Sequence, residues 1–316
     1  MTMTGENHGT PRPTTIDAET ISIVDKAYAY VQHDGSWWIN NAGFVVGSSG
    51  VVLIDTCSTE QRTRSLLGAI RSVTDAPIQA VVNTHHHGDH TYGNCLTAPA
   101  PIIGHRLCRE AAMRTGIKRY EDTFQQPDWG SLQFSPPTIT FESRLDLWVD
   151  DTLIELHAIG HPAHTSNDVV AWLPAQRVLY TGDLVFHGGT PFILMGSVGG
   201  SLRALDALRS FDAVTVVPGH GKLCTPAVFD DIERYLRMIT RVAKRAQTSG
   251  ASPLEAALDL DLGEFATLAD SERLVGNLHR AMAELEGPAA NDAVSLSAAI
   301  ADMVTLRGGP LLPCSA

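Results

Sequence analysis

The segment Thr84–His90, which reads Thr-His-His-His-Gly-Asp-His, constrains this chain more than any other. It directly follows the short apolar run 80–82, which we predict to be a buried strand. A metal ion needs nitrogen and oxygen donors that converge within about 2.0–2.2 Å. Residues two apart in an extended segment point the same way, so His85 and His87 can share one metal, while His86 should point away.

The second half of the segment can serve a second metal. Asp89 and His90 lie one turn further on, and Gly88 lets the backbone bend between the two sets of donors. The alternative is a surface histidine cluster or an adventitious chelator. The position after a buried strand favours a functional site, because active sites of α/β proteins lie at strand ends.

Three further segments place a polar residue on a glycine-containing turn at the end of a predicted strand. They carry His164 after strand 153–159, Asp183 after strand 178–181 and His220 after strand 214–217. Strand ends at one sheet edge lie close together, so the seven donors should converge. We predict one metal on His85, His87 and His164, a second on Asp89, His90 and His220, and Asp183 between them.

The donor set contains only nitrogen and oxygen atoms. This suits two Zn²⁺ ions and is also compatible with Fe or Mn. Two such metals lower the pKa of a shared water toward about 7 and provide a nucleophile at neutral pH. We expect Asp89 to be the catalytic carboxylate that orients this hydroxide or shuttles a proton.

These same residues resemble a known superfamily. The run from His85 to His90, with His164, Asp183 and His220, is similar to the metallo-β-lactamase superfamily over about residues 25–225. The resemblance implies an α/β protein with an αββα four-layer sandwich and a binuclear site on one edge. Asp183, in place of a cysteine, resembles the glyoxalase II-type and other broad hydrolase branches more than the lactamases themselves.

Residues 34–44, 161–168 and 188–192 carry a narrower resemblance. They are similar to an actinobacterial branch that includes the second-ring cyclases of aromatic polyketide biosynthesis, such as the actinorhodin-type cyclase. This resemblance implies an enzyme of antibiotic biosynthesis that closes a ring by aldol condensation. The same enzyme would release the product from its acyl carrier protein as a thioesterase. The alternative is a generic metal-dependent hydrolase of thioesters, lactones or hydroxyacyl-glutathione.

Apolar patterning predicts strands over 37–46 and 51–54 and a helix over 59–73 that Ser58 or Thr59 can cap. The chain as a whole is predicted to have three parts. Residues 1–20 form a disordered polar lead, residues 21–225 the metallo-β-lactamase-fold catalytic domain, and residues 226–316 a C-terminal helical region. The C-terminal helices could cap the pocket, form the interface of a homodimer or buttress the sandwich.

Several residues near the predicted site are candidates for binding substrate. Trp37 and Trp38 adjoin a predicted hairpin turn, and strand alternation would bury one and expose the other to stack on a flat substrate. The alternative is that both pack inside the sandwich. Phe186, His187 and Thr190 follow Asp183 closely along the chain.

The poorly periodic stretch 116–145 is a further candidate wall of the pocket. It contains Phe124, Trp129 and Phe134, and long loops inside a compact domain are usually functional. These aromatic residues could instead form a small core beneath the loop.

Two residues near the first strand-to-helix turn have supporting roles. We interpret Cys57 as structural, because no base is paired with it. Asp55 is expected to orient His85 or a neighbouring ligand.

The composition limits the partners of the enzyme. A net charge of −12 disfavours nucleic acid and anionic membranes, and no apolar run approaches the roughly 18 residues of a membrane span. The five scattered cysteines and the absence of a signal-peptide pattern predict a cytoplasmic protein. The substrate is therefore expected to be a small molecule, free or bound to an acyl carrier protein.

One helix face could recognise an acidic carrier protein. Arginines recur there at helical spacing, at Arg234, Arg237, Arg241 and Arg245. A solvated helix face is the commoner role of such a pattern.

Two other classes of function compete with a hydrolase. A diiron redox protein could share the fold, but the histidine-rich donor set and the lack of a flavin-like segment disfavour it. A catalytically silent metal-binding protein is disfavoured by the complete set of seven donors.

Overall fold

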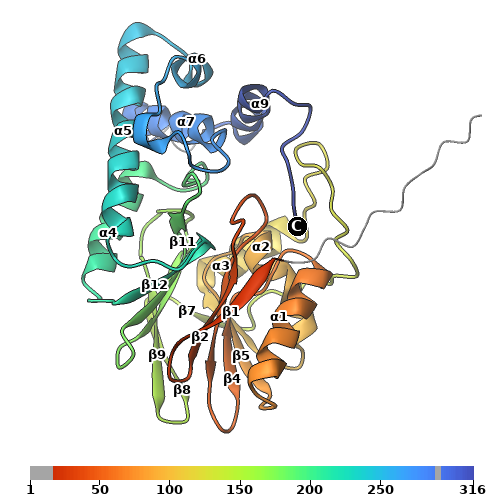
Figure 1. Ribbon diagram of the computed structural model, residues 1–316. Coiled ribbons are helices and arrows are strands. Elements are labelled where there is room, and N and C mark those ends of the chain that lie inside the picture. Colours follow the sequence, from red (N-terminus) through yellow and green to blue (C-terminus); the bar gives the residue numbers. More distant parts are fainter. Residues whose placement is uncertain (1–16, 289–292) are drawn as a thin grey trace, which may run out of the picture.

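Two β-sheets face each other in this computed structural model, which describes residues 17–288 and 293–316 (Figure 1). The first sheet has seven strands in sequence order: β1 (Ala18–Val24), β2 (Ala27–Gln32), β3 (Ala42–Val46), β4 (Val51–Ile54), β5 (Ile78–Asn83), β6 (Ile102–His105) and β7 (Ile139–Phe141). Strands β1 to β4 pair antiparallel, and β4 to β7 pair parallel.

The second sheet has five strands in the order β12-β11-β10-β9-β8. They are β8 (Arg144–Val149), β9 (Thr152–Ala158), β10 (Val169–Leu173), β11 (Val178–His187) and β12 (Thr215–Gly221). All neighbours pair antiparallel except β11 and β12, which run parallel.

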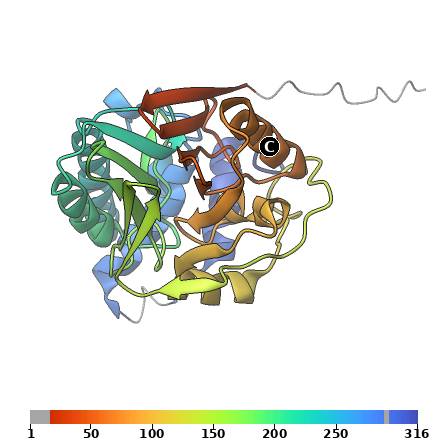
Figure 2. The ribbon, with the colours of Figure 1, turned by 90° about the horizontal axis from the view of Figure 1, so that it is seen from below.

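Helices cover both outer faces of the sheet pair (Figures 1 and 2). Those from the first half of the chain are α1 (Glu60–Val73), α2 (Gly88–Thr91) and α3 (Arg106–Thr115), with the 3₁₀ helix η1 (Tyr92–Thr97). Those from the second half are α4 (Val198–Arg209), α5 (Val228–Ser249), α6 (Pro253–Leu258), α7 (Arg273–Glu286) and α9 (Leu296–Arg307), with the 3₁₀ helix η2 (Gly263–Phe265). None of the described helices is long and apolar enough to cross a membrane.

Three hydrophobic clusters lie between the layers, and β2 shows how the sequence divides between two of them. Ala29 and Val31 point into the cluster between the sheets, whereas Tyr28 and Tyr30 point toward α1. This is the alternation that a strand buried on both faces requires. The third cluster joins the second sheet to α4, α5, α7 and α9. The predicted four-layer αββα sandwich with a C-terminal helical extension is therefore confirmed.

The N-terminal part of the fold differs from the prediction. The expected disordered lead ran to residue 20, but Ala18–Val24 form β1. Ile21 and Ile23 alternate with polar residues there, pack on the core between the sheets, and lie in a strand that pairs with β2. Residues 1–16 of that lead lie outside the described residues.

The predicted strand 37–46 is also shorter than expected, because only Ala42–Val46 form β3. Trp38 has a positive φ of 69°, which a strand does not allow. The side chain of Asn41 bonds to the backbone of Gln32, Pro218 and Gly221 and so holds residues 37–41 as a turn between the two sheets.

The helical region after Pro226 shares its hydrophobic cluster with the second sheet, so it buttresses the sandwich. In Figure 1, α7 and α9 lie above the open edge of the two sheets, and the C-terminal segment descends from α9 toward α2. The boundary predicted between residues 225 and 226, the cytoplasmic location and the homodimer stay predictions.

Candidate metal centre

The histidine-rich segment leaves β5 through bends at residues 84–86 and then enters α2. His87 is the N-cap of α2, with φ −65° and ψ 151°. His85 and His87 lie together, with ring centroids 4.6 Å apart. His86 points the other way, as its parity predicts, and its Nδ1 lies 3.1 Å from the side-chain nitrogen of Asn167. A Cβ at Gly88 would lie 2.3 Å from the Tyr92 ring, so this position needs glycine.

The other three donors come from the second sheet and one of its connections: Asp183 lies inside β11, His220 is the last residue but one of β12, and His164 lies between β9 and β10. We expected Asp183 and His220 to follow their strands, but β11 and β12 continue through both residues. The register of the β11–β12 pair shifts at Gly182, whose φ is +51°. This irregularity re-aims the Asp183 side chain within an otherwise continuous strand. His164 lies in the turn between β9 and β10, as expected.

The seven predicted donors come together in two sets. Within each set the candidate ligand atoms lie within 4.8 Å of one another: His85, His87, His164 and Asp183 in one set, and Asp89, His90 and His220 in the other. In the first set, His87 Nδ1 and His164 Nε2 are 2.9 Å apart. In the second, His220 Nε2 and Asp89 Oδ2 are 3.2 Å apart.

Asp183 lies between the two sets. Its Oδ2 is 3.4 Å from His164 Nε2, and its Oδ1 is 3.0 Å from His90 Nε2. The carboxylate thus faces one imidazole from each set, which is the position predicted for a bridging ligand.

The hydrogen-bonding of these side chains fits a bound metal. His85 Nε2, His90 Nε2 and Asp183 Oδ1 are buried and make no well-directed hydrogen bond among the described residues; His90 Nε2 and Asp183 Oδ1 face each other at 3.0 Å but are not aligned for one. Leaving a buried polar atom unpaired costs about 1–3 kcal/mol, and coordination would satisfy all three atoms together. Imidazole nitrogen and carboxylate oxygen are donors that Zn²⁺ accepts.

The electrostatics of the centre favour neutral His85 and His87 beside an ionised Asp183. Burial, followed by repulsion from neighbouring imidazoles, sets the pKa of His85 and of His87 well below the ordinary value, so both rings are in the neutral form that binds metal. Burial opposes the charged form of Asp183 as well. The imidazoles of His220 and His90 nevertheless hold the pKa of that carboxyl well below its usual range.

A buried carboxylate behind the centre fixes histidines of both sets. Asp55 Oδ2 accepts from Thr84 Oγ1 at 2.7 Å and lies 2.8 Å from His90 Nδ1. Thr84 Oγ1 in turn lies 3.1 Å from His85 Nδ1. The expected role of Asp55 in orienting His85 or a neighbour thus takes the form of a direct contact to His90 and a relayed one to His85.

The thiol of Cys57 fits its predicted structural role. It is fully buried, and burial raises its pKa to about 12, so the thiolate is not formed at neutral pH.

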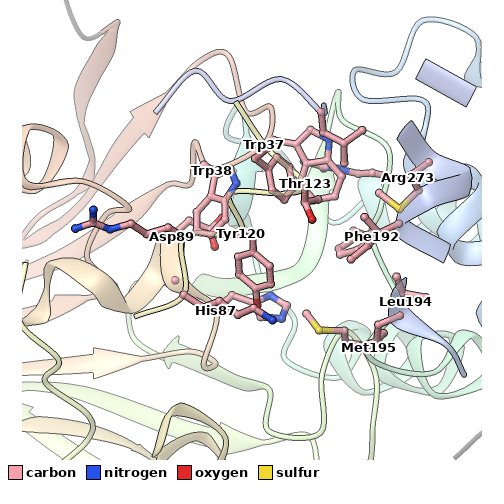
Figure 3. A pocket seen from close by; sticks show the side chains of 18 of the residues that line it. Trp37, Trp38, His87, Asp89, Tyr120, Thr123, Phe192, Leu194, Met195 and Arg273 are labelled. Atoms are coloured by element: carbon pink, nitrogen blue, oxygen red, sulfur yellow. The ribbon is translucent and has the colours of Figure 1, made fainter. Parts of the chain in front are cut away.

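A large cavity of about 1190 Å³ opens onto the centre (Figure 3). His87, Asp89, His164, Asp183 and His220 border it on the side of the sheets. Most of the remaining wall is apolar or aromatic, from residues that include Trp37, Trp38, Phe124, Phe186, Phe192 and Met195. Asp89 is the more accessible of the two carboxylates of the centre, with 13% of its side chain exposed against 4% for Asp183.

Three of the six predicted substrate residues border this cavity: Trp37, Trp38 and Phe186. The expectation that one tryptophan is buried and the other exposed is wrong. Trp37 and Trp38 are 9% and 8% exposed, because they lie in a turn where strand alternation does not apply.

The other three predicted substrate residues do not border the cavity. Trp129 packs behind Trp38 with ring centroids 5.1 Å apart. His187 contacts the Lys222 carbonyl through Nδ1, and Thr190 is buried. Proximity to Asp183 in the sequence therefore predicted Phe186 correctly as a residue of the cavity wall and predicted His187 and Thr190 wrongly.

Sequence reasoning missed the part of the wall that comes from α9. Leu296, Ile300, Met303 and Val304 border the cavity. These residues lie four, seven and eight positions along the helix from Leu296, on one face, but apolar residues such as Ala298 and Leu306 occupy its other faces, so the sequence did not single out this one. Tyr120, Thr123 and Arg273 were also missed. Burial, followed by the charge of Asp89, raises the pKa of Tyr120.

The arginine face of α5 is exposed and partly neutralised. Arg234 pairs with Asp231 and Glu264, and Arg237 pairs with Glu233. These contacts suit a solvated helix face, and docking of an acidic carrier protein there stays a prediction.

Both the sequence and the fold of this chain are similar to those of known proteins. A family model described as the metallo-beta-lactamase superfamily matches residues 35–220. The metallo-beta-lactamase from Pontibacter korlensis superposes with a TM-score of 0.59 at 21% identity, over 70% of this chain and 99% of that one. This likeness shows the fold.

Relatives of the chain include enzymes of different activities. The linear primary-alkylsulfatase of a Pseudomonas strain is 24% identical over 60% of this chain and 42% of its own length. The hydroxyacylglutathione hydrolase of Rhodospirillum rubrum is 29% identical over 44% of this chain and 46% of its own length. The matched region thus spans less than half of either relative.

Proposed function

The chain belongs to the metallo-beta-lactamase superfamily, and on that premise we propose that it is a metal-dependent hydrolase of thioesters or esters with a bulky aromatic acyl group. The observation that carries the proposal is the cavity of about 1190 Å³, in which the two sets of metal-binding side chains meet an aromatic wall.

The residues of the centre suit hydrolysis. The donors would hold two Zn²⁺ ions, which supply a Lewis acid and a water of lowered pKa. Asp89 reaches into the cavity and can orient the attacking water and accept its proton. Asp55 and Thr84 fix the rings of His90 and His85, so these donors are preorganised before substrate arrives.

The wall suits a flat, apolar group. Trp37 packs edge-to-face against Phe124 and Phe192, with centroids 5.2 and 5.0 Å apart. These contacts hold the rings in place, and rigid aromatic surfaces favour planar aromatic ligands. Three cations, Lys118, Arg119 and Arg273, also border the cavity, and the guanidinium of Arg273 pairs with Asp270 at 2.8 Å. Such cations could meet the carboxylates of hydroxyacyl-glutathione, so this substrate is compared directly with an aromatic thioester in the assay below.

A cyclase–thioesterase acting on a carrier-bound aromatic polyketide is the specific form of this proposal. Residues from all three segments that resemble that branch border the cavity: Trp37 and Trp38, His164, and Phe192. A cavity of about 1190 Å³ is large enough to hold a folded polyketide chain beside the metal centre. The generic hydrolase is the alternative within the same proposal.

A matched pair of substrates tests the acyl preference. The naphthoyl and acetyl thioesters of one small thiol differ only in the group that the wall would contact. We expect kcat/KM to favour the naphthoyl compound by about 10–100-fold, from the apolar area that it buries. Trp38→Ala should reduce that ratio, and His87→Ala should abolish both metal binding and turnover. Equal rates for the two thioesters, or faster turnover of hydroxyacyl-glutathione, would refute the aromatic preference.

The cyclase form needs its own assay. Incubation with a carrier-bound bicyclic polyketide should yield a free product with one more ring, detected by mass spectrometry. Release of the unchanged bicyclic acid would favour the generic hydrolase.

A further inference from the structure

Tyr120 lies at the edge of the metal centre, in the irregular segment that joins α3 to β7. It borders the cavity, and Figure 3 shows its side chain extending toward His87. Its ring contacts Trp38 at a centroid distance of 6.0 Å, and the Lys118 ammonium lies 4.7 Å from the ring centroid. The side chain is thus held in one place beside the predicted ligands.

The backbone at Tyr120 is unusual. Its φ is +48°, in the left-handed region that aromatic residues rarely occupy. Such a conformation persists only where the surroundings determine it, and it is concentrated at functional sites.

Contacts on two sides hold this turn. On one side, the Tyr92 hydroxyl bonds to both the carbonyl and the N–H of Lys118, at 2.7 and 2.8 Å. On the other, the Leu312 N–H donates to the Thr123 carbonyl at 2.8 Å, and the Gln125 N–H donates to the Leu312 carbonyl at 2.9 Å. Contacts from Tyr92 on one side and from Leu312 on the other therefore hold the strained backbone at Tyr120 in place.

The hydroxyl of Tyr120 differs from those of three other largely buried tyrosines. Tyr92, Tyr180 and Tyr235 each bond through the hydroxyl to a protein group. Within the described residues, the Tyr120 hydroxyl has no such partner, and its side chain borders the cavity. A phenol O–H normally finds a partner when its ring is buried, so this donor is free for a ligand.

We propose that the Tyr120 hydroxyl donates a hydrogen bond to the carbonyl oxygen of the scissile acyl group and stabilises the negative charge that forms there. This role rests on the proposed hydrolase function. As the oxygen of water bonds to the acyl carbon, Asp89 takes the water proton and the carbonyl electron pair moves onto oxygen. Tyr120 keeps its own proton throughout. When the pair returns, the C–S bond breaks, and the thiolate leaves and takes a proton from solvent.

Tyr120→Phe removes only the hydroxyl and keeps the ring. Loss of one donor to a developing oxyanion costs about 10²–10³ in kcat, with KM changed by less than about threefold. The metal content, measured by atomic emission, should not change. Tyr28→Phe is the matched control, because Tyr28 stacks on Phe44 in the first sheet, outside the cavity lining.

A binding measurement separates this inference from the function on which it rests. A phosphonate that mimics the tetrahedral state of the naphthoyl thioester should bind Tyr120→Phe more weakly by about the factor lost in kcat. The corresponding methyl ketone should bind both proteins with affinities within about threefold, because its carbonyl carries no developed charge.

The outcomes are distinguishable. A variant with unchanged kcat and unchanged phosphonate affinity would show that Tyr120 only packs in the wall, and this would overturn the inference. A wild-type enzyme that cleaves neither thioester would instead refute the proposed function. In that case, weaker phosphonate binding to Tyr120→Phe in calorimetry would still support the assignment of the hydroxyl as an oxyanion donor.

Discussion

Replacing Asp55 with asparagine should weaken metal binding in both sets of donors. One carboxylate oxygen, Oδ2, accepts from Thr84 Oγ1 at 2.7 Å and from His90 Nδ1 at 2.8 Å. For Thr84 to donate to Asp55, it must accept the Nδ1 proton of His85. Both histidines then present a bare Nε2 to the centre, which is the form that a metal requires.

The Asp55→Asn substitution would put an NH₂ group where Oδ2 now lies, because the other oxygen is needed by the Thr84 N–H at 2.8 Å. The NH₂ group would face the N–H of His90, donor against donor. His90 would then shift its proton to Nε2 and block its own coordination. Loss of such a supporting contact costs about 10–100-fold in metal affinity, or about 1.4–2.8 kcal/mol for each metal.

Calorimetric titration of Zn²⁺ into the metal-free protein measures this effect. Asp150→Asn is the control, because Asp150 accepts from the backbone of Ser48 and the hydroxyl of Ser49 in an exposed turn. The control should bind Zn²⁺ as the wild type does. Affinities within twofold of wild type in Asp55→Asn would refute the relay from Asp55 to the two histidines.

Three further substitutions test other parts of the account. Gly219→Ala should lower the metal content of a folded protein, measured by atomic emission, because the new Cβ would lie 2.0 Å from Asp183 Oδ1; a full metal content would contradict the packing. His86→Asn should change metal content and kcat by less than about threefold, since His86 faces away from the centre; loss of metal would make it a ligand. Leu312→Ala should lower the free energy of unfolding by about 2–5 kcal/mol and speed amide exchange at Gln125, because Leu312 is fully buried against that segment; unchanged exchange would show that Leu312 does not hold the turn.

Local sequence signals predicted the regular elements well. The helix predicted over 59–73 forms over Glu60–Val73 with Thr59 as its N-cap, and strand β4 forms over the predicted Val51–Ile54. Both depend on short-range patterns of apolar residues and on a capping side chain. Strands β1, β7 and β8 were missed. They lie at sheet edges, where a strand depends on its pairing with a distant partner.

The metal-binding side chains were found because each is near a glycine and a buried strand, and these are local features. The pocket was harder to predict from sequence. Arg273 and Tyr120 come from segments about 150 residues apart, and only the folding of α7 and α9 over the open sheet edge makes them part of one cavity. Asp183 was correctly selected but wrongly placed after its strand, because the register shift at Gly182 depends on β12.

The central claim is that seven side chains, arranged in two sets, hold two metal ions. Anomalous diffraction at the zinc absorption edge, from crystals grown with Zn²⁺, tests it most directly. We expect two peaks about 3.5–4 Å apart, as in other two-metal hydrolases. One peak should lie among His85, His87 and His164, the other among Asp89, His90 and His220, with Asp183 between them. A single peak, or no peak within bonding distance of these side chains, would contradict the account.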